Sequence, residues 1–149
     1  IGVAAVFFVR DYFGERYQSL SAENFMPGYG EAVRYADSVS QEGQTVYSTY
    51  RHVAAPFMVA LYYLQTPADE FIETVQWREE GAEFMVADSF GKYVFGLPEH
   101  PEELLYNGEV LILHREELEP YADWDGIVIE ETGMFAVVHQ EHYNRVEEE

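Results

Sequence analysis

Residues 45–64, with the sequence TVYSTYRHVAAPFMVALYYL, decide the predicted fold. Residues 45–50 are rich in β-branched and aromatic side chains, a composition that predicts a strand. Pro56 then stands where proline favours the first turn of a helix, and an apolar run continues to Leu64. Because apolar residues occupy nearly every side of this second segment, we expect a deeply buried helix. A strand that leads directly into such a helix is typical of α/β proteins.

Helix signals also stand on both sides of this unit. Between Gly28 and Gly43, apolar residues recur at three- and four-residue spacing, which predicts one amphipathic helix. Downstream, Thr66 is expected to cap a third helix whose first position is Pro67 and which ends at about Val75. The early part of the chain therefore alternates helix, strand and helix.

The remaining predicted strands are short apolar or β-branched runs at residues 84–87, 93–95, 110–113, 127–129 and 134–138. The first two flank a predicted turn at residues 88–91, and the last two are joined through Gly133 as a C-terminal β-hairpin. This order predicts an α/β fold, a single-domain α/β sandwich with a mixed, Rossmann-like sheet.

The composition is that of a folded, strongly acidic protein. Hydrophobic residues make up 48% of the 149 residues and aromatic residues 16%, which is too much apolar content for a disordered chain. The chain has 28 acidic residues against 8 basic ones, a formal charge of −20. This charge argues against a nucleic-acid partner, because such binding depends on basic side chains that neutralise phosphates. Cysteine is absent, which excludes disulfides and cysteine-ligated metal sites.

An uncharged apolar run opens the sequence at residues 1–9. It is too short to cross a bilayer, which takes about 20 residues, but it suits the last two turns of a truncated span. A buried strand or a short core helix is the alternative. Tyr12 and Phe13 follow, as aromatic residues do at membrane interfaces, and they favour the truncated span. The predicted order is a transmembrane remnant, a juxtamembrane connector, a soluble α/β domain and an acidic tail, at residues 1–10, 11–26, 27–146 and 147–149.

Familiar catalytic and cofactor motifs are not complete in this sequence. Residues 28–30 (GYG) lack the third glycine and the preceding strand of a dinucleotide fingerprint, and Ser89 is not in a hydrolase elbow. His139 and His142 could in principle bind a divalent metal, but no helical pattern aligns them, so we expect solvated tail residues. Paired carboxylates, which glycosidases use, are expected by chance among 28 acidic residues. The sequence therefore predicts no catalytic residue, no cofactor and no metal ligand.

Arg51 and His52 are the candidate ligand-binding residues. They follow the predicted strand at residues 45–50 directly, and open α/β sheets place their ligand crevices outside the carboxyl ends of strands. A structural or capping role for His52 is the alternative, because the order of the strands is not given by the sequence. We therefore expect Arg51 and His52 to lie at the edge of a crevice.

Several short aromatic and small-residue segments form a recognisable series. They are Phe8, Tyr12-Phe13 and Tyr17; Phe25, Gly28, Glu31-Ala32 and Tyr35-Ala36; residues 45–49; Ala60-Leu61-Tyr62-Tyr63, Thr66-Pro67 and Phe71; and residues 84–95. The series resembles the stretch after the last membrane span of polytopic family 39-type glycosyltransferases. These are relatives of the protein O-mannosyltransferases and of the lipid A aminoarabinose transferases. The resemblance covers residues 7–96.

This resemblance implies a parent enzyme that transfers a lipid-phosphate-linked sugar on the extracytoplasmic side of the cell membrane. In such enzymes the acidic catalytic residues lie in loops between membrane helices, and none of those loops is in this sequence. We therefore expect a non-catalytic domain that assists acceptor positioning or stability. Its partners would be the transmembrane region of its own parent chain and a glycan or protein acceptor. The alternative is a secreted or membrane-anchored α/β binding module for a peptide or glycan.

Overall fold

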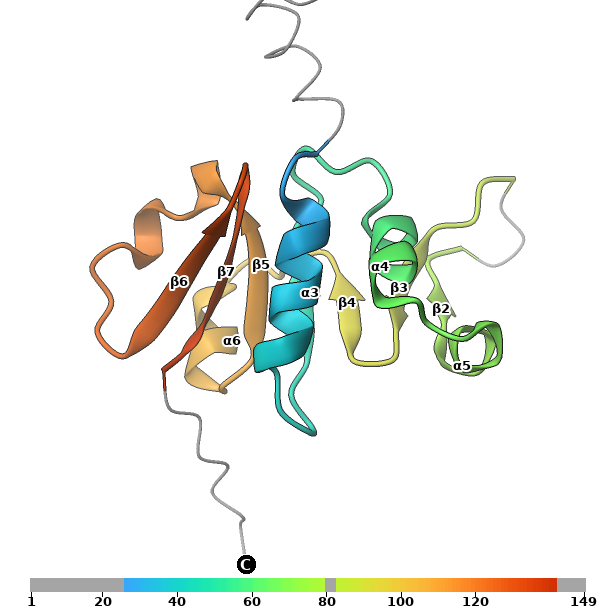
Figure 1. Ribbon diagram of the computed structural model, residues 1–149, viewed down its shortest axis with the longest axis horizontal. Helices are drawn as coiled ribbons and strands as arrows, with labels where there is room; N and C mark the ends of the chain where they lie inside the picture. Colours follow the sequence, from blue (N-terminus) through green and yellow to red (C-terminus); the bar gives the residue numbers. More distant parts are fainter. Residues whose placement is uncertain (1–25, 80–82, 142–149) are drawn as a thin grey trace, which may run out of the picture.

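The computed structural model describes residues 26–79 and 83–141. Within them the chain forms a seven-stranded mixed sheet in the order β2-β3-β4-β1-β5-β7-β6, with helices packed against it (Figure 1). The predicted α/β class and the C-terminal β-hairpin are confirmed. The proposed transmembrane remnant, all of the connector except Met26, and the acidic tail lie outside the described residues. No helix in the described ranges is long and apolar enough to span a membrane.

The elements follow one another in an order close to the predicted one. The helices are α3 (Tyr29–Val39), α4 (Pro56–Leu64), α5 (Ala68–Thr74) and α6 (Glu102–Tyr106), with two 3₁₀ turns, η1 (Arg115–Glu117) and η2 (Glu119–Tyr121). The strands are β1 (Val46–Ser48), β2 (Gln76–Trp77), β3 (Ala87–Phe90), β4 (Tyr93–Phe95), β5 (Val110–His114), β6 (Ile127–Thr132) and β7 (Phe135–Gln140).

The centre of the sheet is parallel and its flanks are antiparallel. β1 lies between β4 and β5 and is parallel to both, with Val46 opposite Tyr93 on one side and Val110 on the other. β2, β3, β7 and β6 add antiparallel pairs outside this centre. The carboxyl ends of β4, β1 and β5 therefore meet at one edge of the sheet.

Helices cover both faces of the sheet, so the core has two parts (Figure 1). α3 and α4 pack on one face against the side chains of Val46, Val110 and Ile112. On the other face, Leu105 of α6 and Tyr121 of η2 pack against the remaining side chains of β5 and β7. β5 is buried along its whole length, as its continuous apolar sequence predicts.

α3 is held at its start by close packing against the β6–β7 hairpin. Its N-cap, Gly28, has φ 92°, and a Cβ there would lie 1.7 Å from the carbonyl oxygen of Thr132. The Thr132 hydroxyl donates to the Gly28 carbonyl at 2.9 Å, and the Met134 N–H donates to the Pro27 carbonyl at 3.0 Å. Gly28 therefore serves close packing as well as the helix initiation that the sequence predicts.

Tyr29 joins α3 to the centre of the sheet. Its side chain is fully buried, its ring makes an edge contact with Phe135, and its hydroxyl lies 2.6 Å from the Ser48 Oγ. Burial is the main cause that raises the pKa of Tyr29 well above the ordinary tyrosine value. The folded protein therefore keeps this phenol protonated at pH values where an exposed tyrosine loses its proton.

Tyr29→Phe should lower the free energy of unfolding by about 1–3 kcal/mol, because the buried Ser48 hydroxyl loses a partner. Above about pH 10 the unfolded chain binds fewer protons than the folded one at Tyr29, so wild-type stability should fall with rising pH. The variant should show a shallower alkaline fall. Urea unfolding at neutral and alkaline pH measures both effects.

Tyr62→Phe is the matched control, because Tyr62 is 76% exposed. Its stability and its alkaline slope should equal those of the wild type. An equal loss of stability in both variants would show that the effect of Tyr29→Phe does not come from the buried hydrogen bond with Ser48.

The prediction of a deeply buried helix at α4 is wrong in part. Pro56, Phe57 and Ala60 are buried, but Met58 is 61% exposed and Tyr62 is 76% exposed. α4 lies in a single layer between the sheet and solvent, with α3 beside it, so it has buried sides and an open one (Figure 1). An apolar sequence alone could not show that no second layer covers this helix in the described structure.

The β3–β4 hairpin is shifted from its predicted position. The strand begins at Ala87 rather than Phe84, which is 81% exposed, and the turn lies at Gly91 and Lys92. Phe90, predicted in the turn, is buried in the strand opposite Tyr93. Similarly, α5 begins at Ala68, with Pro67 at the N-cap position and no side-chain cap.

Candidate functional site

The candidate site lies at the carboxyl ends of β1 and β5, which are neighbouring parallel strands. After β1 the chain leads to α4 on one face of the sheet, whereas after β5 it leads to η1 and η2 on the other. Such a point, where the connections from neighbouring parallel strands leave toward opposite faces, is where open α/β sheets form ligand crevices. Arg51 and His52 lie between β1 and α4 at this point.

The β1 side of the site is set by a tight turn after Thr49. The Arg51 N–H donates to the Thr49 Oγ1 at 2.9 Å, and this hydroxyl donates to the Glu117 Oε1 at 3.0 Å. His52 follows with φ 55°, in the left-handed region that residues other than glycine adopt uncommonly. The turn thereby directs two consecutive exposed side chains, Arg51 and His52, toward η1.

The β5 side is set by a capping arrangement at the start of η1. The Glu117 carboxylate accepts the His114 N–H at 2.8 Å, and the His114 Nδ1 accepts the Glu116 N–H at 3.3 Å. The His114 side chain is only 4% exposed and packs edge-on against Phe135. Its Nε2 is buried and has no hydrogen-bond partner among the described residues.

Glu116 brings the two sides together. Its Oε2 lies 2.6 Å from the Arg51 Nη2, 3.6 Å from the His52 Nε2 and 3.8 Å from the His114 Nδ1. The two imidazole rings lie with their centroids 4.5 Å apart. The site therefore combines a guanidinium, two imidazoles and a carboxylate from two strand ends.

Two of these groups have shifted pKa values. Burial, followed by the neighbouring His52, lowers the pKa of His114 below its ordinary value, which favours the neutral imidazole. The hydrogen bond from Arg51 is the main cause that lowers the pKa of Glu116. At neutral pH the site thus presents an ionised carboxylate beside a neutral buried imidazole.

The sequence identified Arg51 and His52 but missed His114, Glu116 and Glu117. Residues 110–113 were predicted as a buried strand, so the residues directly after them carried the same signal as Arg51 and His52. The missing information was the strand order, which makes β5 the neighbour of β1. The other histidine candidate, His139, pairs instead with Tyr35 and a backbone carbonyl at the opposite edge, and His142 lies outside the described residues.

An acidic cavity of about 390 Å³ adjoins the site on the η1–η2 side. Its polar lining consists of glutamates, and its apolar lining comes from leucine, proline and tyrosine side chains: Glu99, Glu102, Glu116, Glu117 and Glu119, with Leu97, Leu113, Pro101, Pro120 and Tyr121. Since Glu116 belongs to both, the cavity and the histidine pair form one continuous region. The negative lining favours ligands that carry positive charge or many hydroxyl donors.

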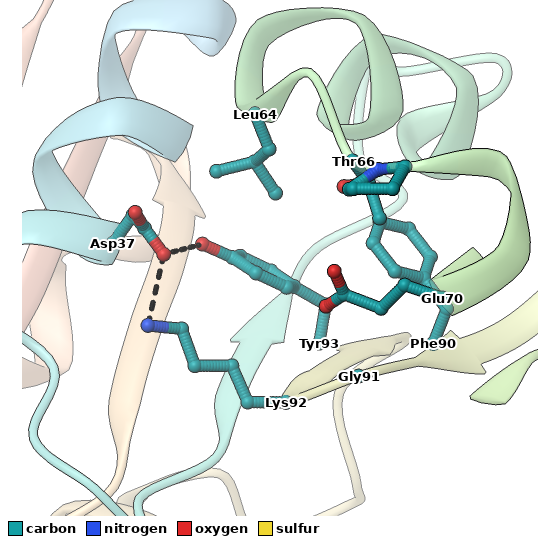
Figure 2. Close-up of a pocket in the computed structure, with 9 residues that line it drawn as sticks. Asp37, Leu64, Thr66, Glu70, Phe90, Gly91, Lys92 and Tyr93 are labelled. Carbon is teal, nitrogen blue, oxygen red and sulfur yellow. Dashed lines mark hydrogen bonds and ion pairs between the residues drawn. The ribbon is translucent and has the colours of Figure 1, made fainter.

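Figure 2 shows a second cavity, of about 370 Å³, at the opposite edge of the sheet beside the turn into β4. The Asp37 Oδ1 accepts the Tyr93 hydroxyl at 3.0 Å and pairs with the Lys92 Nζ at 2.8 Å. These polar groups satisfy one another across the cavity. Thr66 and Glu70 also line this cavity.

Comparison with known proteins gives no family for this chain. The sequence matches no protein-family model, and no curated protein or solved structure matches it. The fold class is therefore established by the sheet and helices themselves.

Proposed function

We propose that this chain is a non-catalytic extracytoplasmic domain of a family 39-type membrane glycosyltransferase, and that it helps to position the acceptor at the carboxyl edge of β1 and β5. The parent enzyme would use a lipid-phosphate-linked sugar donor. The observation that carries the proposal is the meeting of Arg51 and His52 with Glu116 and an acidic cavity at the sheet's switch point. These groups can hydrogen-bond to the hydroxyls of a glycan or to a peptide.

The geometry at this edge suits binding better than nucleophilic chemistry. The Thr49 hydroxyl is buried and committed to two hydrogen bonds, with the Arg51 N–H and the Glu117 carboxylate. Glu116 is paired with Arg51 through both Nε and Nη2. Activated nucleophiles need a free hydroxyl, amine or carboxylate beside a base, and these groups are already engaged with each other.

The resemblance to the glycosyltransferases falls on consecutive elements of the fold. Within the described residues it covers α3, β1, α4, α5, β2, β3 and β4, which include the parallel pair β1–β4 and the helices on one face. These elements carry Arg51 and His52 between β1 and α4. The resemblance therefore includes Arg51 and His52, whereas His114, Glu116 and Glu117 of the site lie beyond it.

The position of Met26 supports a crevice that faces the membrane. The start of α3 lies beside the β6–β7 turn, because the Met134 N–H donates to the Pro27 carbonyl. This turn adjoins the carboxyl end of β5. Met26, the last residue of the predicted connector, therefore lies at this same edge of the sheet. Exposed Met58 and Tyr62 of α4 would then be available to pack on the transmembrane region of the parent chain.

Replacing Arg51 or His52 by alanine in the full-length parent enzyme should raise the KM for acceptor about tenfold, because a charged or polar contact is lost. The melting temperature should stay unchanged, since both side chains are exposed. Sugar transfer to the acceptor, measured as a function of acceptor concentration, tests this directly.

Arg115→Ala is the matched control, because Arg115 is also exposed and paired with a carboxylate, its Nε lying 3.0 Å from the Glu131 Oε2. It should leave the KM unchanged. Equal turnover and KM in all variants would show that Arg51 and His52 are ordinary surface residues. The isolated chain should transfer no sugar, and measurable transfer would contradict a non-catalytic role.

The full reading frame separates this proposal from its alternative. Eight or more membrane spans with an acidic residue in the first outer loop would support the glycosyltransferase. A single anchor or a secretion signal would instead indicate a binding module for a peptide or glycan, with the same crevice as its ligand site.

A further inference from the structure

We propose that His52, His114 and Glu116 form a binding site for a divalent transition-metal ion of the zinc type. One ligand atom from each residue lies within 4.8 Å of the other two. The three residues come from two neighbouring strand ends rather than from one flexible loop. Metal binding by these residues does not depend on glycosyl transfer.

The distances are close to those that a zinc ion requires. Ligand atoms at about 2.0–2.1 Å from a tetrahedral ion lie about 3.4 Å from one another. The Glu116 Oε2 is already 3.6 Å from the His52 Nε2 and 3.8 Å from the His114 Nδ1. Closing the remaining gaps requires side-chain rotations of His52, which is 43% exposed, and of Glu116, which is 54% exposed.

His114 is the fixed ligand of the three. Its ring is held between His52 and Phe135, at centroid distances of 4.5 and 5.4 Å, at the end of the fully buried strand β5. Because the Nδ1 accepts the Glu116 N–H, the neutral ring carries its proton on Nε2 and directs the Nδ1 lone pair toward Glu116. That hydrogen bond is long, at 3.3 Å, so a metal bond would replace a weak interaction.

The chemistry of the donor set selects the class of ion. Two imidazoles and one carboxylate suit zinc and similar transition metals, whereas magnesium and calcium prefer oxygen ligands throughout. Three protein ligands leave a fourth position for water or for a ligand atom. The adjoining glutamate-lined cavity adds negative potential that favours a cation at this edge.

Arg51 is the competitor for the same carboxylate oxygen. Its Nη2 lies 2.6 Å from the Glu116 Oε2, and the side chain is 51% exposed and can move aside. A metal ion on Glu116 must therefore displace this guanidinium. Removing the guanidinium should strengthen metal binding, which is the opposite of what loss of a merely structural ion pair would do.

Titration of the purified chain with Zn²⁺ by calorimetry, and with Co²⁺ by visible absorption, tests the site. We expect one ion bound per chain, with a Co²⁺ spectrum typical of nitrogen and oxygen ligands in a tetrahedral field. His52→Ala and Glu116→Gln should each weaken Zn²⁺ binding about 100-fold, because each removes one of three ligands. Arg51→Gln should tighten binding severalfold. Mg²⁺ at the same concentrations should not compete.

His100→Ala is the matched control, because His100 and Glu102 form an exposed pair with Nδ1 and Oε1 3.2 Å apart. It should bind Zn²⁺ as the wild type does. Equal weakening in the His100 and His52 variants, or no stoichiometric Zn²⁺ binding by the wild type, would overturn the proposal. Circular dichroism of the His52 and Glu116 variants checks that both remain folded. These outcomes are separate from acceptor KM values, so the metal site can fail while the proposed acceptor role stands.

Discussion

Gly28→Ala should lower the free energy of unfolding by about 4 kcal/mol or more, because left-handed strain adds to a backbone collision. Gly28 has φ 92°, and a Cβ would lie 1.7 Å from the Thr132 oxygen and 2.9 Å from the Gly133 Cα. Both obstacles are backbone atoms, which no side-chain rotation can move. The hydrogen bonds between Pro27–Gly28 and the β6–β7 turn would have to break.

A loss of this size is a large part of the 5–15 kcal/mol that stabilises a typical domain. Gly126→Ala is the matched control, since Gly126 has φ 80° and no heavy atom lies within 4 Å of its Cβ position. It should cost about 1–2 kcal/mol from backbone strain alone. Urea unfolding of the three proteins measures the difference. Equal losses at Gly28 and Gly126 would show that α3 can shift away from the hairpin.

Phe135→Ala should destabilise the domain by about 3–5 kcal/mol, the usual cost of a buried aromatic truncation. Phe135 is fully buried and makes edge contacts with Tyr29 and His114, at centroid distances of 5.1 and 5.4 Å. The substitution leaves a cavity between α3 and the sheet. It also removes the ring that packs against one side of His114. The candidate site should therefore become less ordered together with the core.

Phe84→Ala is the control with the same chemical change, because Phe84 is 81% exposed. Its stability should differ from that of the wild type by no more than about 0.5 kcal/mol. Phe135→Leu keeps most of the volume and should recover a large part of the loss. A loss at Phe84 as large as that at Phe135 would contradict the core described here.

The helix and strand types were predicted well where the local pattern was strong. β5 has a continuous apolar sequence and is buried along its length, and the terminal hairpin turns at Gly133, as predicted. The β3–β4 hairpin was misplaced because residues 88–91 carry polar and glycine signals of a turn. The pairing of Phe90 with Tyr93 buries an aromatic ring and outweighs those local preferences.

Of the residues that meet at the candidate site, the sequence singled out Arg51 and His52. Arg51 and His52 follow a recognisable strand, so their place at a carboxyl end could be read locally. His114 and Glu116 lie more than 60 positions further along the chain. Arg51 and its partner Glu116, for example, are 65 residues apart in the sequence. These four residues come into contact only because β5 lies beside β1 in the sheet. The periodicity of the sequence does not indicate the order of the strands.

By itself, the sequence determined the α/β class, the acidic surface and the approximate helices and strands, because these follow from side-chain volume, charge and local backbone preference. Tertiary structure alone decided that α4 keeps an exposed apolar side and that His52, His114 and Glu116 meet. Both depend on which surfaces the other elements cover and on which strands become neighbours. Those outcomes minimise the free energy of the whole domain, so no single segment encodes them.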